Sequence, residues 1–188
     1  DGDMNATRSI LVNSDTNLVA RIDVNVYSVV LSAENGVVTG AGEYDYGTKV
    51  TLTAQPNEGY HFVRWSDGNE NATRDITITD NLTLSAEFAI NTYNVVLTAE
   101  NGVVSGAGEY EHGTEITIEV TPNAHYHFVR WSDDNTESSR KIKVTSDLTL
   151  HALCSIDEFE VVGEAINGDI LGIGKYGYGT TIELSAVA

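Results

Sequence analysis

The sequence predicts a mainly β protein in which small antiparallel-sheet repeats of 66 residues follow one another to form an elongated rod. Three observations predict this class. The segment that begins at Tyr27 recurs without a gap at Tyr93, and a shorter copy begins at Phe159. Within each copy apolar and polar residues alternate, which is the period of a strand with one buried face. No segment of useful length has a helical period, and only a single short turn fits 57–65.

The register of the repeat divides the chain into four units. Whole repeats occupy 25–90 and 91–156. The unit 1–24 matches the C-terminal part of a repeat, because its NATRSILV corresponds to NATRDITI in the first whole repeat, and 157–188 matches the N-terminal part. We therefore expect either a fragment of a longer array or a chain whose incomplete ends complete each other between molecules.

The N-terminal half of the first whole repeat is predicted to form strands joined by tight turns. Alternation over 27–33 predicts the first strand, and the Asn-Gly pair at 35–36 predicts a hairpin turn, since both residues tolerate a positive φ. A second strand follows directly and runs into the glycines of 40–42, which indicate a bulge or a close backbone approach. The Tyr-Gly pair at 46–47 predicts the next turn, and alternation over 50–54 predicts the third strand.

The C-terminal half of the repeat adds further strands. The Pro-Asn-Glu-Gly segment at 56–59 predicts a turn, and 60–65 reads as a fourth strand. A polar loop covers 66–71. A short fifth strand is marked by 76–78, and the alternation of 82–88 predicts the sixth.

The joints between the units contain no glycine, proline or long linker. Inward residues stand at even positions up to 90 and at odd positions from 93, so the side chains change faces at the joint. The same change recurs at each boundary, which predicts a kink near Asn25, Asn91 and Asp157. We expect such direct joints to be stiff and to produce a rod.

Charge and composition exclude several classes of partner. The 188 residues include 28 acidic and 10 basic side chains, for a formal charge of −18, and 41% of the residues are apolar. A phosphate backbone requires a basic patch, so we expect no nucleic-acid partner. An anionic lipid surface is disfavoured for the same reason, and no apolar run is long enough for membrane insertion. Cys154 is the only cysteine, which rules out a disulfide within the chain.

The order of short motifs in each copy resembles a known family. The first whole repeat carries Y-x-V-x-L, NG-x-V, G-x-G-x-Y and YGT-x-VTLTA-x-P, followed by GYHFVRWSDG and a final LTLSAEF. In this order the motifs resemble the divergent internalin B-type repeat of bacterial cell-surface proteins. The strongest marker is the GY-x-F-x-x-W segment at 59–65, and the second copy departs from the pattern at His125 and Cys154.

The resemblance has implications for both fold and location. It implies a β-grasp-like, mostly antiparallel module. It also implies a place in long surface or secreted proteins, where such repeats act as spacers, adhesion arms or binding segments, and it supplies no catalytic residues.

The aromatic residues of the marker segment allow two interpretations. Trp65 and Trp131, together with Tyr60 and Tyr126, could form a platform on which a sugar ring stacks. The alternative is that each tryptophan belongs to the core of a small sheet that has few other large residues.

The loop after each tryptophan carries oxygen-bearing side chains at alternate positions, a spacing that suits Ca²⁺. An EF-hand loop would need glycine at its sixth position and glutamate at its twelfth, where this sequence has Ala72 and Ile78. A polar hairpin loop is therefore the alternative, and apart from Ca²⁺ the sequence predicts no cofactor. The candidate ligands are Asp67, Asn69 and Asn71, then Asp133, Asn135 and Glu137, and in the N-terminal unit Asp1, Asp3 and Asn5.

The histidines and the cysteine are candidate reactive groups. His61, His125 and His127 stand beside aromatic residues, and the last two are predicted to share a strand face. A zinc site needs three or four converging ligands, and only one repeat has even a pair. Cys154 takes an inward position and is therefore expected to be an apolar filler. A nucleophilic cysteine would need a nearby histidine, but His151 falls on the other face of the strand.

These observations favour a protein that is not an enzyme. A catalytic site encoded in a repeat should recur in each copy, but the recurring residues are mostly turn glycines and apolar or aromatic positions. We expect an extracellular bacterial surface repeat protein that serves as a stalk, spacer or adhesin segment. One alternative is a glycan- or protein-binding module, whose partner is a host or surface molecule. Another is a filament subunit that assembles head to tail by strand complementation of its partial end repeats, so that its partners are neighbouring repeats of the same or another copy.

Overall fold

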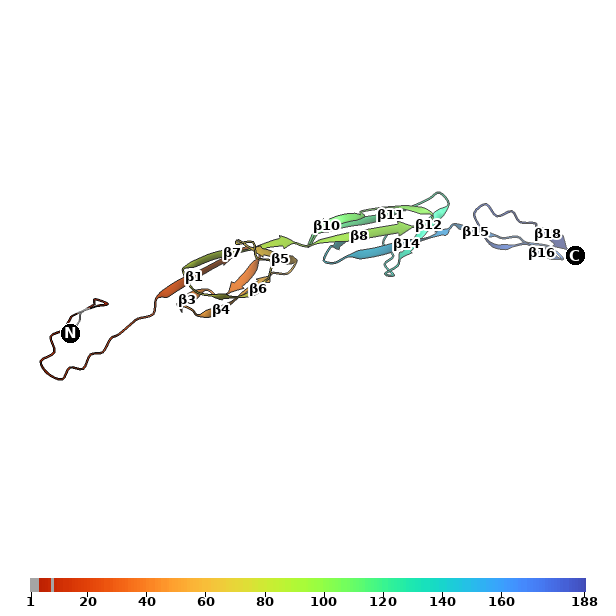
Figure 1. Cartoon of the computed structure of the whole chain (residues 1–188). Helices are drawn as coiled ribbons and strands as arrows, with labels where there is room; N and C mark the ends of the chain where they lie inside the picture. Colours follow the sequence, from red (N-terminus) through yellow and green to blue (C-terminus); the bar gives the residue numbers. More distant parts are fainter. Residues whose placement is uncertain (1–3, 8) are drawn as a thin grey trace.

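The computed structural model describes residues 4–7 and 9–188, and this part of the chain contains strands but no helix. Two whole repeats and a shorter third unit follow one another along the molecule, which is elongated as the repeat predicted (Figure 1). The strands of the first repeat are β1 (Val26–Ala33), β2 (Gly36–Thr39), β3 (Gly42–Asp45), β4 (Lys49–Pro56), β5 (Tyr60–Trp65), β6 (Thr73–Thr77) and β7 (Leu82–Ile90). Those of the second are β8 (Thr92–Ala99), β9 (Gly102–Ser105), β10 (Gly108–Glu111), β11 (Glu115–Pro122), β12 (Tyr126–Trp131), β13 (Ser139–Lys143) and β14 (Leu148–Ile156). The third unit has β15 (Glu158–Val161), β16 (Asp169–Leu171), β17 (Gly174–Gly177) and β18 (Ser185–Val187).

Each whole repeat is built from two small sheets. In the first repeat the strand orders are β3-β1-β7-β5 and β2-β4-β6, and the second repeat has the equivalent orders β10-β8-β14-β12 and β13-β11-β9. The sheets are mostly antiparallel, as expected, and the central pair is the exception, because β1 and β7 run parallel from Val29 opposite Leu82 to Ala33 opposite Ala86. The pair β8 and β14 repeats this arrangement. Alternation predicts which face of a strand is buried but not which strands become neighbours.

A short strand that the sequence did not predict, β3, follows β2 in the other sheet. The chain therefore changes sheets between Thr39 and Gly42. Gly40 has a φ of 104°, and a Cβ at this position would lie 2.7 Å from the carbonyl oxygen of Thr51. The Tyr44 hydroxyl on β3 then donates a hydrogen bond of 3.2 Å to the Gly40 carbonyl. The glycines were predicted to form a bulge or a close backbone approach, and the close approach is confirmed: they mark a crossover that requires both a positive φ and close backbone packing.

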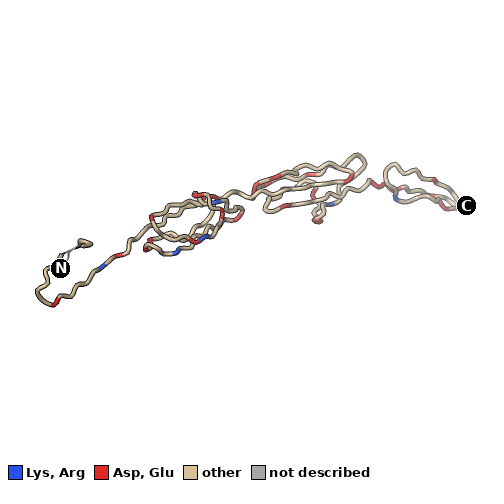
Figure 2. Tube along the Cα trace, viewed as in Figure 1, with Lys and Arg blue, Asp and Glu red and all other residues tan. Residues whose placement is uncertain are grey.

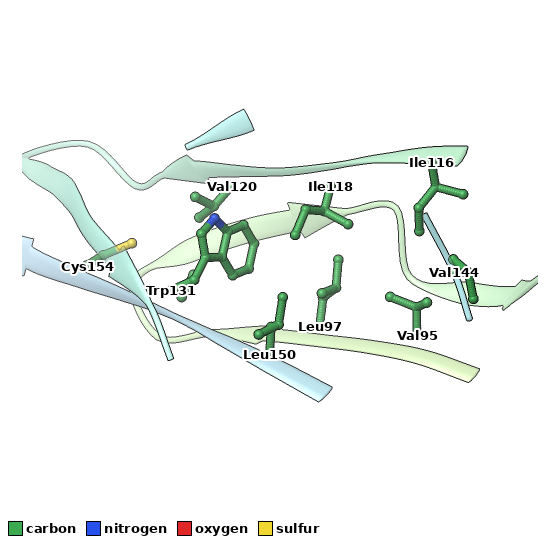
Figure 3. Close-up of a cluster of buried hydrophobic side chains, with 10 residues drawn as sticks. Val95, Leu97, Ile116, Ile118, Val120, Trp131, Val144, Leu150 and Cys154 are labelled. Atoms are coloured by element: carbon green, nitrogen blue, oxygen red, sulfur yellow. The ribbon is translucent and has the colours of Figure 1, made fainter. Parts of the chain in front are cut away.

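The core of each repeat lies between its two sheets. In the first repeat Trp65 and Leu52 are both 0% exposed and Ile78 is 2% exposed. The second repeat has the same core with Trp131 at its centre and Ile118 facing it, as Figure 3 shows. The strands alternate between buried and exposed residues, so the period-2 pattern identified the inward face correctly.

The two incomplete units differ from each other. The third unit forms two two-stranded sheets, β15-β17 and β16-β18, which copy the pairing of β1 with β3 and of β2 with β4. Among the described residues before β1 no strand forms. The inward parity of the repeat predicts that Ile22 and Val24 face inward, but this is wrong: they are 89% and 57% exposed, because no partner strand lies beside them among the described residues.

Candidate functional site

Successive units meet at joints that are held by main-chain hydrogen bonds. We call residues 57–59 and 123–125 the end turns, and residues 45–47, 111–113 and 177–179 the aromatic turns. At the first joint the Asn91 N–H donates to the Gly59 carbonyl, and the His112 N–H donates to the Asn91 carbonyl, both at 2.8 Å. The end turn of the first repeat is therefore connected through Asn91 to the aromatic turn of the second.

The second joint repeats the same two bonds between the second repeat and the third unit. The Asp157 N–H donates to the His125 carbonyl at 2.8 Å, and the Tyr178 N–H donates to the Asp157 carbonyl at 2.8 Å. The predicted kinks at Asn91 and Asp157 are thus positions where the main chain itself is bonded to both neighbours. The strands β7 and β8, and likewise β14 and β15, are separated by a single residue, so no linker intervenes at either joint.

Side chains add a second layer of contacts at each joint. His61 Nδ1 lies 2.7 Å from Asn91 Oδ1 at the first joint. His127 Nδ1 lies 3.0 Å from Asp157 Oδ1 at the second. The two joints therefore share a histidine on the strand that follows the end turn, bonded to the side chain of the residue between the repeats.

The joints explain where the histidines lie. His125 belongs to an end turn with a φ of 67° and precedes β12, so the expectation that it shares a strand face with His127 is wrong. Its ring stacks on Tyr178, with the ring centres 3.4 Å apart and the planes 7° from parallel. The histidines thus face different partners, and the described residues contain no group of three or more His, Cys, Asp or Glu side chains that could hold a metal ion.

The tryptophans do not provide a stacking platform. Trp65 and Trp131 are both 0% exposed, so neither indole presents a face to a ligand, and the interpretation as core residues is confirmed. Tyr60 and Tyr126 begin β5 and β12, are partly buried, and stand opposite the last residues of β7 and β14. The proposed platform therefore fails because the large apolar ring is needed inside each small core.

The loop after Trp65 uses its oxygen atoms internally. The Trp65 Nε1–H donates to the Asn71 carbonyl at 3.0 Å. Asp67 accepts the Asn69 N–H at 3.2 Å, and Asn69 in turn accepts the Asn71 N–H at 2.9 Å. Arg74 Nη1 and Nη2 donate to the two oxygens of Asp67 at 3.0 and 2.6 Å. The oxygens considered for Ca²⁺ thus form a hairpin loop closed by an arginine.

The second repeat builds the same loop. Arg140 donates to Asp133, the Glu137 N–H donates to Asn135 Oδ1 at 2.9 Å, and the Trp131 Nε1–H donates to the Glu137 carbonyl at 2.9 Å. Arg74 and Arg140 were missed by the sequence analysis, although their recurrence 66 positions apart together with the aspartates was a usable signal. In the N-terminal unit Asp1 and Asp3 lie outside the described residues, and Asn5 is exposed.

The arginines set the ionisation of the loop carboxylates. The Arg74 hydrogen bond holds the pKa of Asp67 below its ordinary value, and Arg140 does the same for the pKa of Asp133. In each loop a smaller contribution comes from the backbone N–H two residues later, while partial burial acts in the opposite direction. Both carboxylates therefore stay charged to lower pH than in an unfolded chain.

Cys154 is buried on β14, as expected for an apolar filler, and burial raises the pKa of its thiol. Its sulfur packs against Gly102, where the first repeat packs Phe88 against Gly36. His151 contacts Thr98 at 3.0 Å and does not approach the thiol. Nothing at Cys154 supplies the electropositive, accessible setting that a nucleophilic thiolate needs.

An open groove with a mixed polar and apolar lining is present at one end of the larger sheet of the first repeat. It encloses about 820 Å³ and is lined from β1, β5 and β7. Arg64 and Glu87 form an exposed ion pair of 2.8 Å within it. In the second repeat Leu153 replaces Glu87, and Arg130 pairs with Asp134 at 2.5 Å instead. The groove therefore differs between the repeats, unlike the main-chain bonds of the joints and the loops that follow the tryptophans.

Acidic side chains are distributed along the whole described chain, with the few basic ones scattered among them (Figure 2). Several basic residues are paired, as in Lys141 with Glu115 at 2.8 Å, which lowers the pKa of Glu115 and raises that of Lys141. This distribution leaves no basic surface of the kind that a nucleic acid would need among the described residues.

The fold and the joints define a chain of tandem β repeats with a structured contact between neighbours. Residues 27–92 and 93–153 match the divergent InlB B-repeat domain, so the chain belongs to this family. The resemblance inferred from the motifs is thereby confirmed.

Two relatives come from Evansella cellulosilytica. One, named as a membrane protein, is 30% identical over 175 residues, which is 88% of this chain and 26% of the relative. The other, named as a Gly-rich membrane protein, is 31% identical over 161 residues, which is 80% of this chain and 19% of the relative. The chain thus spans about a quarter or less of the length of these relatives. No helix in residues 4–7 and 9–188 has the length and hydropathy that crossing a membrane requires.

Proposed function

We propose that this chain is a non-enzymatic segment of an extracellular bacterial surface protein, in which it serves as a stalk or spacer that holds an adhesive element away from the cell. Membership of the repeat family and the membrane-protein names of two longer relatives support a surface location. The repeated acidic surface supports the extended state, because like charges along the array disfavour collapse and lateral association.

The observation that carries the proposal is the bonded joint. A spacer has to keep its two ends far apart. A flexible linker does this poorly, because its end-to-end distance grows only with the square root of its length. Here Asn91 and Asp157 each form main-chain bonds to both neighbouring units, so length is added by rigid units rather than by coil.

Small-angle X-ray scattering tests the proposal. The chain is expected to give the profile of an elongated particle. A control variant with a Gly/Ser linker inserted after Ile90 should broaden the distribution of interatomic distances, because it releases the first joint. A compact profile for the unaltered chain, or identical profiles for the two proteins, would contradict the spacer function.

A second candidate, binding of a glycan or a surface protein, is favoured by the groove beside Arg64 and Glu87. The substitution Glu87→Leu copies the second repeat and removes the ion pair without touching the core. A glycan array and a surface-protein panel should give ligands that bind the unaltered chain and lose affinity in E87L. This candidate function would be excluded if neither panel gave a ligand, or if the ligands bound E87L with the same affinity as the unaltered chain.

Head-to-tail assembly is favoured by the third unit. In the described part of the chain β15 pairs only with β17, whereas β1 and β8 each pair with two strands. Residues 16–24 of another copy, which align with β7, would complete it by strand addition. Sedimentation velocity over a hundredfold range of concentration should then show growing species, and a constant monomer would exclude this assembly.

A further inference from the structure

The two joints have the same main-chain bonds but different side-chain pairs. Glycine occupies the end turn at position 59 and faces His112, whereas histidine occupies the end turn at position 125 and faces Tyr178. Positions 59 and 125 are equivalent in the repeat, and so are 112 and 178. The family pattern alone would place glycine in both end turns, so the second joint needs an explanation in its own geometry.

The first joint has no room for a side chain on the end turn. A Cβ built on Gly59 would overlap the imidazole of His112. The His112 ring thus fills the space above the glycine, and its Nδ1 is buried without a hydrogen-bond partner. Gly59 also has a φ of 82°, but this alone does not explain the glycine, because His125 holds a φ of 67° at the equivalent position.

The second joint replaces this overlap with a stack. The imidazole of His125 lies parallel to the Tyr178 ring at 3.4 Å between ring centres. Parallel contact between the two flat rings requires that the ring on the aromatic turn leave space for the ring on the end turn. His125 thereby keeps a positive φ in the end turn, although this conformation strains the backbone of a residue other than glycine.

In the first repeat and in the third unit, the ring of the aromatic turn packs in the same way on a ring of the first strand, whether or not an end turn lies against it. Tyr178 packs on Phe159 with ring centres 6.4 Å apart, and Tyr46 packs on Tyr27 at the same 6.4 Å. Tyr46 is 58% exposed and faces no end turn in the described chain. The surface that receives an end turn therefore forms within its own repeat, before any neighbour docks.

We propose that the residue of the end turn and the ring of the next aromatic turn are a matched pair that determines which repeats can stand next to each other. A glycine end turn fits a histidine ring, and a histidine end turn fits a tyrosine ring. The partner for this surface is another repeat of the same family. Both joints share the main-chain bonds, and the side-chain pair adds the specificity. This inference concerns the choice of neighbour and does not depend on the spacer function.

A double substitution that turns the first joint into the second tests the proposal. Gly59→His alone should break the joint, which is measured by hydrogen exchange of the amides at positions 91 and 112, since both donate across it. We expect their exchange to accelerate at least about tenfold, equivalent to about 1.4 kcal/mol. Adding His112→Tyr should restore most of the protection. Unchanged exchange in G59H, or no recovery in the double variant, would overturn the proposal.

Three further variants separate the joint from the fold of the repeat. The amide of Ala54 bonds within the first repeat, so its protection reports on whether that repeat is folded. If G59H also exposes the Ala54 amide, the reverse change at the second joint is the decisive test. His125→Gly relieves backbone strain, but it should accelerate exchange of the amides at the second joint about three- to tenfold because the ring stack is lost. Adding Tyr178→His should restore the protection. Tyr46→His is the matched control, because it alters an aromatic turn outside both joints and should leave the four joint amides unchanged. A loss of their protection in Y46H, or no effect of H125G, would contradict the matched pair.

Discussion

Arg74 and Asp67 form a two-pronged ion pair, with nitrogen-to-oxygen distances of 3.0 and 2.6 Å, that closes the loop after β5. The guanidinium carbon of Arg74 also lies 5.8 Å from the centre of the Trp65 ring, so one arginine connects the loop to the core. The second repeat forms the same pair between Arg140 and Asp133. This recurrence identifies the pair as part of the repeat's architecture.

Acid should weaken this pair. The pKa of Asp67 is lowered in the folded state by Arg74, so the pair contributes stability above the unfolded pKa of about 3.9 and loses it as the pH falls through the lower folded value. We expect Asp67→Asn to reduce the difference between urea midpoints measured at pH 6 and pH 3. Asp45→Asn, on an exposed strand edge, is the control and should change that difference less. Equal effects of the two variants would contradict a role for the ion pair.

Calcium should not stabilise the repeats. Asp67 is bonded to Arg74, and Asn69 already accepts a main-chain N–H, so a cation would have to displace existing bonds. We expect the melting temperature to stay unchanged when millimolar Ca²⁺ is added in place of an equal ionic strength of NaCl. A rise in melting temperature that disappears in Asp67→Asn would restore the Ca²⁺ interpretation.

Removing the central indole should unfold one repeat. Trp65→Ala deletes a fully buried ring, which costs about 3–5 kcal/mol in typical cores. A repeat of this size has a total stability of only about 3–10 kcal/mol, so the first repeat should lose most or all of its structure. Fluorescence of Trp131 reports on the second repeat in the same sample. A single cooperative transition near the original midpoint would contradict this expectation.

The crossover glycine should be more sensitive than a turn glycine. Gly40→Ala combines a φ of 104° with an overlap against the Thr51 carbonyl, whereas Gly47 has a φ of 83° and no atom within 4 Å of an added Cβ. We expect Gly47→Ala to cost about 1–2 kcal/mol from backbone strain alone. Gly40→Ala should cost about 1–3 kcal/mol more because atoms must move. Chemical denaturation measures both, and equal losses would show that the crossover is not tightly packed.

The sequence predicted the strands well because alternation and turn residues are local signals. The Asn-Gly turn at 35–36, where Asn35 has a φ of 62°, and the alternation of β4 and β7 were all found. The strand β3 was missed because its four residues lie between turn glycines and only one of them, Tyr44, is partly buried. The parallel pairing of β1 with β7 depends on contacts more than 50 residues apart, which no local pattern encodes.

The candidate site was predictable in position but not in chemistry. The joints were located at Asn91 and Asp157 from the change of inward parity alone. The role of His125 could not be foreseen, because its partner Tyr178 is 53 residues away in another unit. The tryptophan platform failed for a physical reason: exposure depends on how two sheets close over a side chain, and residue type indicates only that the ring can stack.

The parallel neighbours β1 and β7 determine how a whole repeat responds to mechanical tension. The chain enters the first repeat at the start of β1 and leaves it at the end of β7, and these strands lie side by side over five residue pairs from Val29–Leu82 to Ala33–Ala86. A pull on the two ends therefore drags the strands in opposite directions along their length. The interstrand hydrogen bonds are sheared together instead of being unzipped one after another, so under force each repeat resists as a unit.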